Sequence, residues 1–153
     1  MKNSILTSIT AFICFSVTAH SQTGFINTFA GGGPNALPAT GANLQYPSNT
    51  AVDSSGNYYI VGSSADVGNE QNRVFKVSSS GTLTVVAGTG YAGYSGDGGL
   101  ATSAQLNYPS AVAVDSSGNV YIADTYNQVI RKVTFSTGII STFAGTPLSL
   151  IHI

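Results

Sequence analysis

This chain carries the sequence Ala51-Val52-Asp53-Ser54-Ser55-Gly56-Asn57 and repeats the same seven residues as Ala113-Val114-Asp115-Ser116-Ser117-Gly118-Asn119. A Tyr-Pro pair precedes both copies, and Tyr59-Ile60 returns as Tyr121-Ile122, always 62 residues later. A fixed period of this length is typical of repeat proteins, in which each repeat is one supersecondary unit. The sequence therefore predicts a scaffold built from two similar units.

A second element occurs three times, at 25–31, 83–88 and 139–145, and ends in glycine each time. Between these elements, short β-branched or aromatic runs alternate with Asp, Ser, Gly and Asn, a pattern that favours strands joined by tight turns. Each repeat is therefore predicted to form four strands. They cover 50–52, 58–61, 73–77 and 82–87 in the first repeat, and 110–114, 120–123, 129–133 and 139–144 in the second.

These strands predict an all-β fold, a partial β-propeller of about two four-stranded antiparallel blades at about 47–87 and 109–144. The first strand of each blade, rich in small residues, is expected nearest the centre of the ring. The segment 25–30 has no blade before it and is expected to be an N-terminal latch strand. Leu44 and Leu106 occupy matching positions and are expected to fill the space between neighbouring blades, each after one helical turn.

The first 21 residues predict a secretory signal peptide, with an uncleaved signal anchor as the alternative. Lys2 supplies the positive start, 5–17 form the apolar core, and the small residues Ala19 and Ser21 suit a cleavage site between 19 and 22. The protein is therefore expected to be secreted, either extracellular or periplasmic, with no membrane span after the signal peptide. Cys14 leaves with that peptide, so no cysteine remains for a disulfide.

Several motifs of the second repeat resemble the NHL-repeat β-propeller family. They are Gly96-Asp97-Gly98-Gly99, Pro109–Asp115, Val120–Thr125 and Ile130-Arg131-Lys132-Val133. The resemblance covers about 24–145. A signal peptide followed directly by such repeats resembles the secreted bacterial members of the family. The resemblance implies rings of about six blades that bind proteins, sugars or RNA, or act as lyases and hydrolases. Two blades are too few to close a ring, so an N-terminal fragment is expected, with the missing blades of the same chain as its structural partners.

Charged residues make up only 7% of the chain, and the net charge is −1. Because a basic patch is missing, the sequence predicts no nucleic-acid partner. The histidines are His20, at the signal junction, and His152, in the tail. Zinc sites and nucleophilic triads depend on such side chains, so we expect no metal, no cofactor and no catalytic residue in the propeller segment 24–146. The tail 147–153 departs from the repeat and is expected to be foreign to it.

Three acidic residues are candidates for a specific role. Asp53 and Asp115 precede Ser-Ser-Gly-Asn and are interpreted as side chains that hold hairpin turns, with calcium ligation as the alternative. Asp97 lies in a Gly-rich loop with Tyr91 and Tyr94. Ligands usually bind to such loops on a rigid scaffold. Tyr91, Tyr94 and Asp97 are therefore the candidate ligand-face site. The alternative is that this Gly-Asp-Gly forms another tight turn.

Five further charged side chains are expected to have structural roles. Asp124 is interpreted as part of a turn at a strand end. Arg73, Lys76, Arg131 and Lys132 are expected at exposed strand edges, where charge prevents unwanted strand pairing. An anion site built from these basic residues is the alternative interpretation.

The function that the sequence favours is a non-catalytic, secreted scaffold whose loops bind an extracellular protein or glycan. The alternatives are part of a propeller lyase or lactonase with a metal in its central channel, and the sensor module of a surface receptor. The predicted inner strand 110–114 offers small and apolar residues to the channel, which argues against metal chemistry there.

Overall fold

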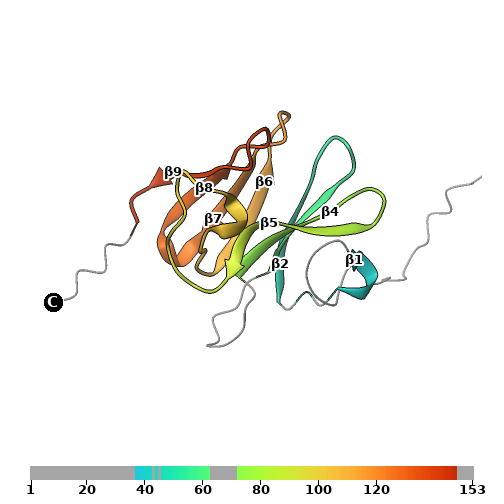
Figure 1. Cartoon of the computed structure of the whole chain (residues 1–153), viewed down its shortest axis with the longest axis horizontal. Coiled ribbons are helices and arrows are strands. Elements are labelled where there is room, and N and C mark those ends of the chain that lie inside the picture. The colour runs from blue at the N-terminus through green and yellow to red at the C-terminus, as the bar shows by residue number, and fades with distance from the viewer. Residues whose placement is uncertain (1–36, 43, 45, 63–71, 148–153) are drawn as a thin grey trace, which may run out of the picture.

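Two antiparallel β-sheets make up the part of the protein that the computed structural model describes, namely residues 37–42, 44, 46–62 and 72–147. The sheets stand side by side like two neighbouring blades (Figure 1). This arrangement confirms the predicted all-β fold, a partial β-propeller. The predicted signal peptide and latch strand lie outside the described residues, as does all of the tail after Pro147.

The first sheet is blade 1. Its strands have the order β1-β5-β4-β3-β2, and all neighbouring strands are antiparallel. The strands are β1 (Leu37–Pro38), β2 (Pro47–Val52), β3 (Tyr58–Gly62), β4 (Asn72–Val77) and β5 (Thr82–Gly90), with the short 3-10 helix η1 (Ala39–Gly41) after β1. Blade 1 therefore contains the four predicted strands and gains the two-residue β1 at its outer edge.

The second sheet is blade 2, with the order β6-β7-β8-β9. Its strands are β6 (Pro109–Val114), β7 (Val120–Asp124), β8 (Val129–Val133) and β9 (Ile140–Gly145), with the 3-10 helices η2 (Ala101–Ser103) and η3 (Thr125–Asn127) in the connections. The strand bounds in both blades differ from the predicted ones by at most three residues. The helical turn expected before Leu106 is η2.

The repeated Asp-Ser-Ser-Gly-Asn segment forms the same turn in both blades. Asp53 Oδ1 accepts hydrogen bonds from the backbone N–H groups of Ser55 and Asn57, both at 2.9 Å. Asp115 Oδ1 accepts the matching pair from Ser117 and Asn119, again at 2.9 Å. The interpretation of both aspartates as turn-holding side chains is therefore confirmed. An Asp at this position supplies an acceptor for backbone N–H groups that a tight turn would otherwise leave without a partner.

The outer edge of each blade is covered by the segment that precedes the blade. In blade 2, the N–H of Ile140 donates to Gly99 O at 3.0 Å, and the N–H of Gly98 donates to Ile140 O at 2.8 Å. In blade 1, β1 pairs with β5 and plays the same part. A covered edge cannot pair with the strands of other molecules. In both blades, the preceding segment therefore protects the outer edge strand from such pairing.

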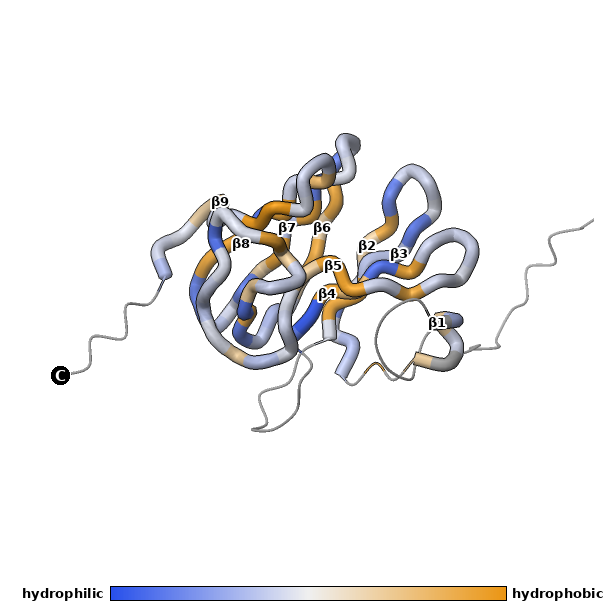
Figure 2. Tube along the Cα trace, viewed as in Figure 1, coloured by the Kyte–Doolittle hydropathy of each residue, from blue (hydrophilic) through white to orange (hydrophobic). Residues whose placement is uncertain are grey.

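A continuous apolar core joins the two blades. Leu106 is fully buried there and packs in one cluster with residues of both sheets, such as Val61 and Ile122. Figure 2 shows the apolar residues along the strands and the polar ones at the turns. The predicted position of Leu106 between the blades is confirmed. Leu44 is partly buried against the opposite face of blade 1, beside Phe75 and Leu83.

The face of blade 2 that points away from blade 1 is open. Ile130 is 36% and Phe143 60% exposed on it. The cross-strand pair Ala123–Ile130 corresponds to Val61–Val74 in blade 1, where both side chains are fully buried by blade 2 and its preceding loop. The open face of blade 2 thus carries apolar residues at the same positions as the face of blade 1 that blade 2 covers.

Candidate functional site

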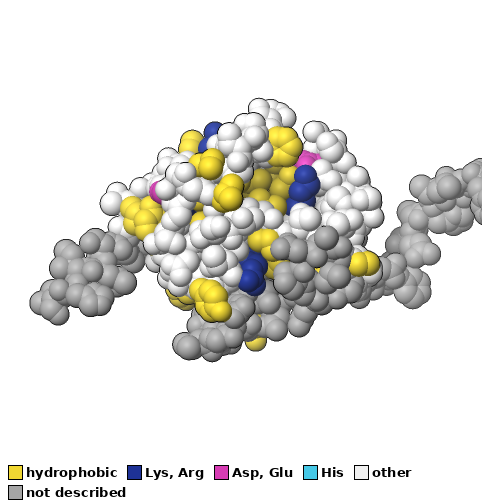
Figure 3. Space-filling view, viewed as in Figure 1, with side chains coloured by type: hydrophobic (Ala, Val, Ile, Leu, Met, Phe, Trp, Pro, Cys, Tyr) yellow, Lys and Arg dark blue, Asp and Glu magenta, His cyan; other side chains and the backbone are white. Residues whose placement is uncertain are grey.

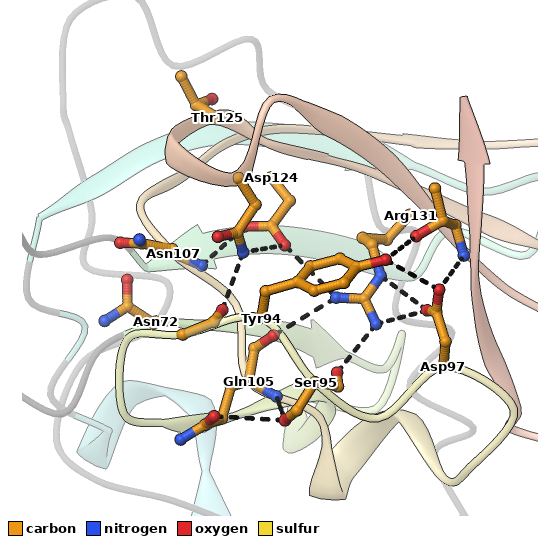
Figure 4. Close-up of polar contacts among 12 residues, drawn as sticks. Asn72, Tyr94, Ser95, Asp97, Gln105, Asn107, Asp124, Thr125 and Arg131 are labelled. Atoms are coloured by element: carbon orange, nitrogen blue, oxygen red, sulfur yellow. Dashed lines mark hydrogen bonds and ion pairs between the residues drawn. The ribbon is translucent and has the colours of Figure 1, made fainter. Parts of the chain in front are cut away.

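The loop from Gly90 to Leu106 is fastened to blade 2 by a network of polar side chains around Arg131 (Figure 4). Arg131 lies in the middle of β8, and its side chain is fully buried. Its guanidinium donates to Asp97 Oδ1 from Nε at 3.1 Å and from Nη2 at 2.7 Å. It also donates to the carbonyl oxygens of Ser95, at 3.0 Å, and Gln105, at 3.4 Å. One side chain therefore holds the loop at three points.

The expectation that the basic residues lie at exposed strand edges is wrong. Arg131 and Lys132 lie on β8, and Arg73 and Lys76 on β4, and each of these strands is flanked by strands on both sides. Arg131 is completely buried, and the other three side chains are half-buried. A central strand can hold a buried Arg only where carboxylates and carbonyls satisfy its donors, and the loop supplies these groups.

Asp124 is the second acid of the network and is also fully buried. Its carboxylate accepts hydrogen bonds from the N–H of Asn107 at 2.7 Å and from Asn127 Nδ2 at 2.8 Å. Arg131 Nη1 lies 3.5 Å from Asp124 Oδ2. Burial raises the pKa of this carboxyl, and the hydrogen bonds and the Arg131 charge only partly offset that effect. Asp124 is thus more than the turn residue that the sequence suggested, because it joins the segment before β6, the helix η3 and the strand β8 through Asn107, Asn127 and Arg131.

Asp97 joins the same network from the loop side. Besides Arg131, it accepts the backbone N–H of Thr142 at 3.0 Å and the hydroxyl of Tyr94 at 3.1 Å. The Tyr94 ring lies over the guanidinium, with 4.9 Å between Arg131 Cζ and the ring centroid. Burial raises the pKa of the Asp97 carboxyl, but the hydrogen bonds of Thr142 and the charge of Arg131 outweigh burial, so the pKa lies below its usual value. Two of the three candidate ligand residues therefore hold the loop in place.

We expect the network to make stability depend on pH in the acid range. Because the folded-state pKa of Asp97 is lowered, its contribution is fully present above the unfolded-state pKa of about 3.9 and is lost as the pH falls through the folded-state value. The Asp97→Asn variant should therefore lose less stability than the wild type between about pH 5 and pH 2. The measurement is the urea midpoint at each pH. Parallel curves for the two proteins would contradict this assignment.

Three tyrosines remain on the surface at the end of the molecule where the connections β5–β6 and β7–β8 lie. Tyr91 is 60% and Tyr126 53% exposed. The Tyr126 ring stacks on that of Tyr108, with centroids 4.7 Å apart. Beside this pair, the hydroxyls of Ser110 and Thr125 form a hydrogen bond of 2.5 Å. We call Tyr91, Tyr108, Tyr126, Ser110 and Thr125 the tyrosine platform.

The sequence singled out Tyr91 in this loop but missed the Tyr108–Tyr126 pair. The repeated Tyr-Pro at 46–47 and 108–109 is the feature of the sequence that could have drawn attention to Tyr108. Both tyrosines have a positive φ, 49° at Tyr46 and 51° at Tyr108. That conformation is unfavourable for residues with a Cβ and persists only where the surroundings enforce it. At Tyr108 the N–H donates to Asn72 Oδ1 at 2.9 Å, a bond between the blades.

The candidate site offers aromatic faces, hydroxyls and carbonyls. Among residues 37–42, 44, 46–62 and 72–147, no three His, Cys, Asp or Glu side chains come together in a way that would hold a metal ion. In the same residues, no helix reaches the length and apolar character required to cross a bilayer. The arrangement therefore suits recognition by stacking and hydrogen bonding.

Comparison with known proteins places the repeats in a family. The family model for the Teneurin NHL domain matches residues 35–134 and 90–150. Teneurin-4 of Homo sapiens is 34% identical to this chain over 103 residues, which are 60% of this chain and 4% of that protein. The chain therefore spans only a small part of the length of this relative.

One solved structure shows a similar architecture. A crystal structure of a protein of unknown function from Bacteroides thetaiotaomicron aligns with a TM-score of 0.52 and 26% identity, over 64% of this chain and 23% of that chain. Virginiamycin B lyase from Staphylococcus aureus aligns less closely, over 68% of this chain and 28% of that chain, with 17% identity and a TM-score of 0.44. Since the family model matches well over half of the residues, the chain belongs to the Teneurin NHL domain family.

Proposed function

We propose that this protein is a secreted, non-catalytic binding scaffold that recognises an extracellular glycan through the tyrosine platform. The observation that carries the proposal is the stacked pair of Tyr108 and Tyr126, in which Tyr126 is exposed and Tyr108 half-buried, beside the hydroxyls of Ser110 and Thr125. Aromatic faces with hydroxyl groups next to them suit sugar rings, which present C–H faces and hydroxyls. Secretion rests on the signal-peptide pattern of the first 21 residues.

The platform is held rigidly, as a recognition surface must be. The N–H of Tyr126 donates to Asn107 O at 3.0 Å, and Asn127 Nδ2 donates to Gly93 O at 2.8 Å. These bonds tie the connection β7–β8 to the loop that carries Tyr91. A preformed surface loses little conformational entropy when it binds a ligand. The absence of net charge on the five platform side chains favours a neutral glycan over a charged protein surface.

The test is a glycan array probed with the purified chain, followed by titration of any glycan that binds. Tyr126→Ala should weaken binding by roughly three- to tenfold, the value of one aromatic contact of about 0.5–1.5 kcal/mol. Phe135→Ala is the control, because Phe135 is 64% exposed at the opposite end of the blades. An array without any bound glycan would overturn the glycan proposal. Recovery of a cleaved glycan would instead support the lyase or hydrolase alternative.

We also propose that further blades of the same kind cover the open face of blade 2. The support is the equivalence of the two blades. Gly145 and Gly88 both have a positive φ, at 92° and 96°, and at both positions an added Cβ would collide with the backbone that leads into the third strand of the blade. In blade 1 the strand β5 continues past Gly88 to Gly90 and then leads into the loop that covers the neighbouring face. Such blades are the structural partners that the sequence predicts.

A further inference from the structure

A cleft separates the two blades at the end of the molecule opposite the tyrosine platform. This end is formed by the turns β2–β3, β4–β5, β6–β7 and β8–β9. The cleft encloses about 280 Å³, and most of its lining is apolar, with Val86 and Tyr59 from blade 1 and Val120, Val133 and Phe135 from blade 2. Figure 3 shows a hollow in the surface, with apolar side chains gathered inside it and a basic side chain at its rim.

Lys76 supplies the cation of this cleft. Its Nζ lies 5.4 Å from the ring centroid of Tyr59 and 5.9 Å from that of Phe135, so the ammonium group is held between two aromatic rings. Within the described part of the chain, no ion pair of Lys76 is present. Aromatic rings attract a cation but do not neutralise its charge. The charge of Lys76 also helps to lower the pKa of the nearby Asp53 carboxyl, but no ion pair joins the two groups among the described residues, and Lys76 lines the cleft.

A second, polar groove of about 200 Å³ adjoins the apolar cleft. The two share Lys76, Tyr59, Gly118 and Phe135, so Lys76 stands at their junction. The groove is lined by the repeated turns and includes the carboxylates of Asp53 and Asp115. Both oxygens of each carboxylate already accept hydrogen bonds within their own turn, from backbone N–H groups, from an Asn side chain and from a Tyr hydroxyl. These neutral donors leave the negative charge of both carboxylates in place, so an anion that pairs with Lys76 must approach it from the apolar cleft, which neither aspartate lines.

We propose that this inter-blade cleft binds a small amphipathic carboxylate, whose apolar body fills the cleft and whose carboxylate pairs with Lys76. Pockets for small ligands are mostly apolar with a few polar groups that fix orientation. At about 30 Å³ for each atom, the volume suits an apolar body on the order of ten non-hydrogen atoms. The proposal is independent of the tyrosine platform, which lies at the other end of the blades.

The experiment compares three probes of the same shape, namely 4-phenylbutyrate, 4-phenylbutanol and 4-phenylbutylamine. Binding of each probe to the full chain is followed by NMR titration of the backbone amides. The acid should bind most tightly and the amine most weakly. The shifts should be largest at Gly118, Val133 and Phe135, which line the cleft. The affinity for the acid should fall with added salt, because the Lys76 pair is partly exposed to solvent.

The repeat provides a matched pair of variants. Lys76→Met retains the apolar stem and removes the charge, so it should weaken the acid by about fivefold, the upper end for a partly exposed ion pair, and leave the alcohol unchanged. Lys132→Met is the control. Lys132 pairs across the strands with Tyr121 as Lys76 does with Tyr59, and its Nζ lies 5.5 Å from the Tyr121 ring, but it does not line the cleft.

A third variant tests the cleft itself. Thr102 lines the cleft and is exposed, so Thr102→Phe should fill the entrance without disturbing the core, and all three probes should lose affinity together. The proposal is overturned if no probe binds, if the amine binds as tightly as the acid, or if Lys76→Met and Lys132→Met weaken the acid equally.

Discussion

Replacing Arg131 by Met is expected to remove about 3–5 kcal/mol from the free energy of unfolding, the range for breaking one partner of a buried ion pair. The Met side chain fills much of the same space but leaves the fully buried Asp124 carboxylate without its cation. It also leaves the carbonyls of Ser95 and Gln105 without their donor. Since small domains have a total stability of about 5–15 kcal/mol, such a loss is measurable as a large shift of the urea midpoint.

Two controls separate the buried charge from a general effect of substitution. Lys132→Met changes the adjacent residue, which is half-buried and whose ammonium group lies over the Tyr121 ring, and it should cost below about 1 kcal/mol. Adding Asp124→Asn to Arg131→Met removes the uncompensated charge and should restore part of the stability. If Arg131→Met costs no more than Lys132→Met, the network does not hold the loop.

Local sequence was sufficient to predict the elements whose partners lie close in the chain. The turn at Asp115 depends on groups two and four residues away, and the strands follow from alternation between such turns. Repetition extended the prediction to Leu106, because its counterpart Leu44 occurs in the same context. The fold and the order of the blades could therefore be predicted from the sequence alone.

Arg131 shows why part of the site could not be predicted from the sequence. Its main partner, Asp97, lies 34 residues earlier in a glycine-rich loop, and nothing local links the two. A charged residue in a strand is ordinarily exposed, so the expected placement was reasonable but wrong. The alternation itself did carry a signal, because Val129, Arg131 and Val133 share one face of β8 and all three are buried. An Arg on an apolar face indicates a carboxylate elsewhere in the chain.

The tyrosine platform and the cleft at Lys76 were not predicted either, because their residues come from separate elements. The tyrosine platform brings together side chains from the loop before β6, from β6 itself and from η3. The cleft at Lys76 exists only because two blades meet at an angle that leaves space between Val86 and Val133. Sequence periodicity shows which face of a strand a residue occupies, but the gap between two sheets depends on how they pack.

The second large effect is expected at the apolar contact between the blades. Leu106→Ala should cost about 2–5 kcal/mol, because Leu106 is fully buried and its removal leaves a cavity that two rigid sheets cannot close. The matched variant is Leu44→Ala, the same residue in the first repeat, which is only partly buried against blade 1 and should cost less. Urea unfolding of both variants gives the two free energies.

Hydrogen exchange adds a second measurement at the same place. The backbone N–H of Gly93 donates to Leu106 O at 3.1 Å, and that of Thr89 donates to Ala104 O at 2.9 Å, so both amides report on the contact between the loop and the blades. In Leu106→Ala these amides should exchange sooner, while the turn amide of Gly56, bonded to Asp53 O, should change less. Equal costs for the two leucine variants would mean that the blades are joined by their inner strands β2 and β6 and not by the leucine between them.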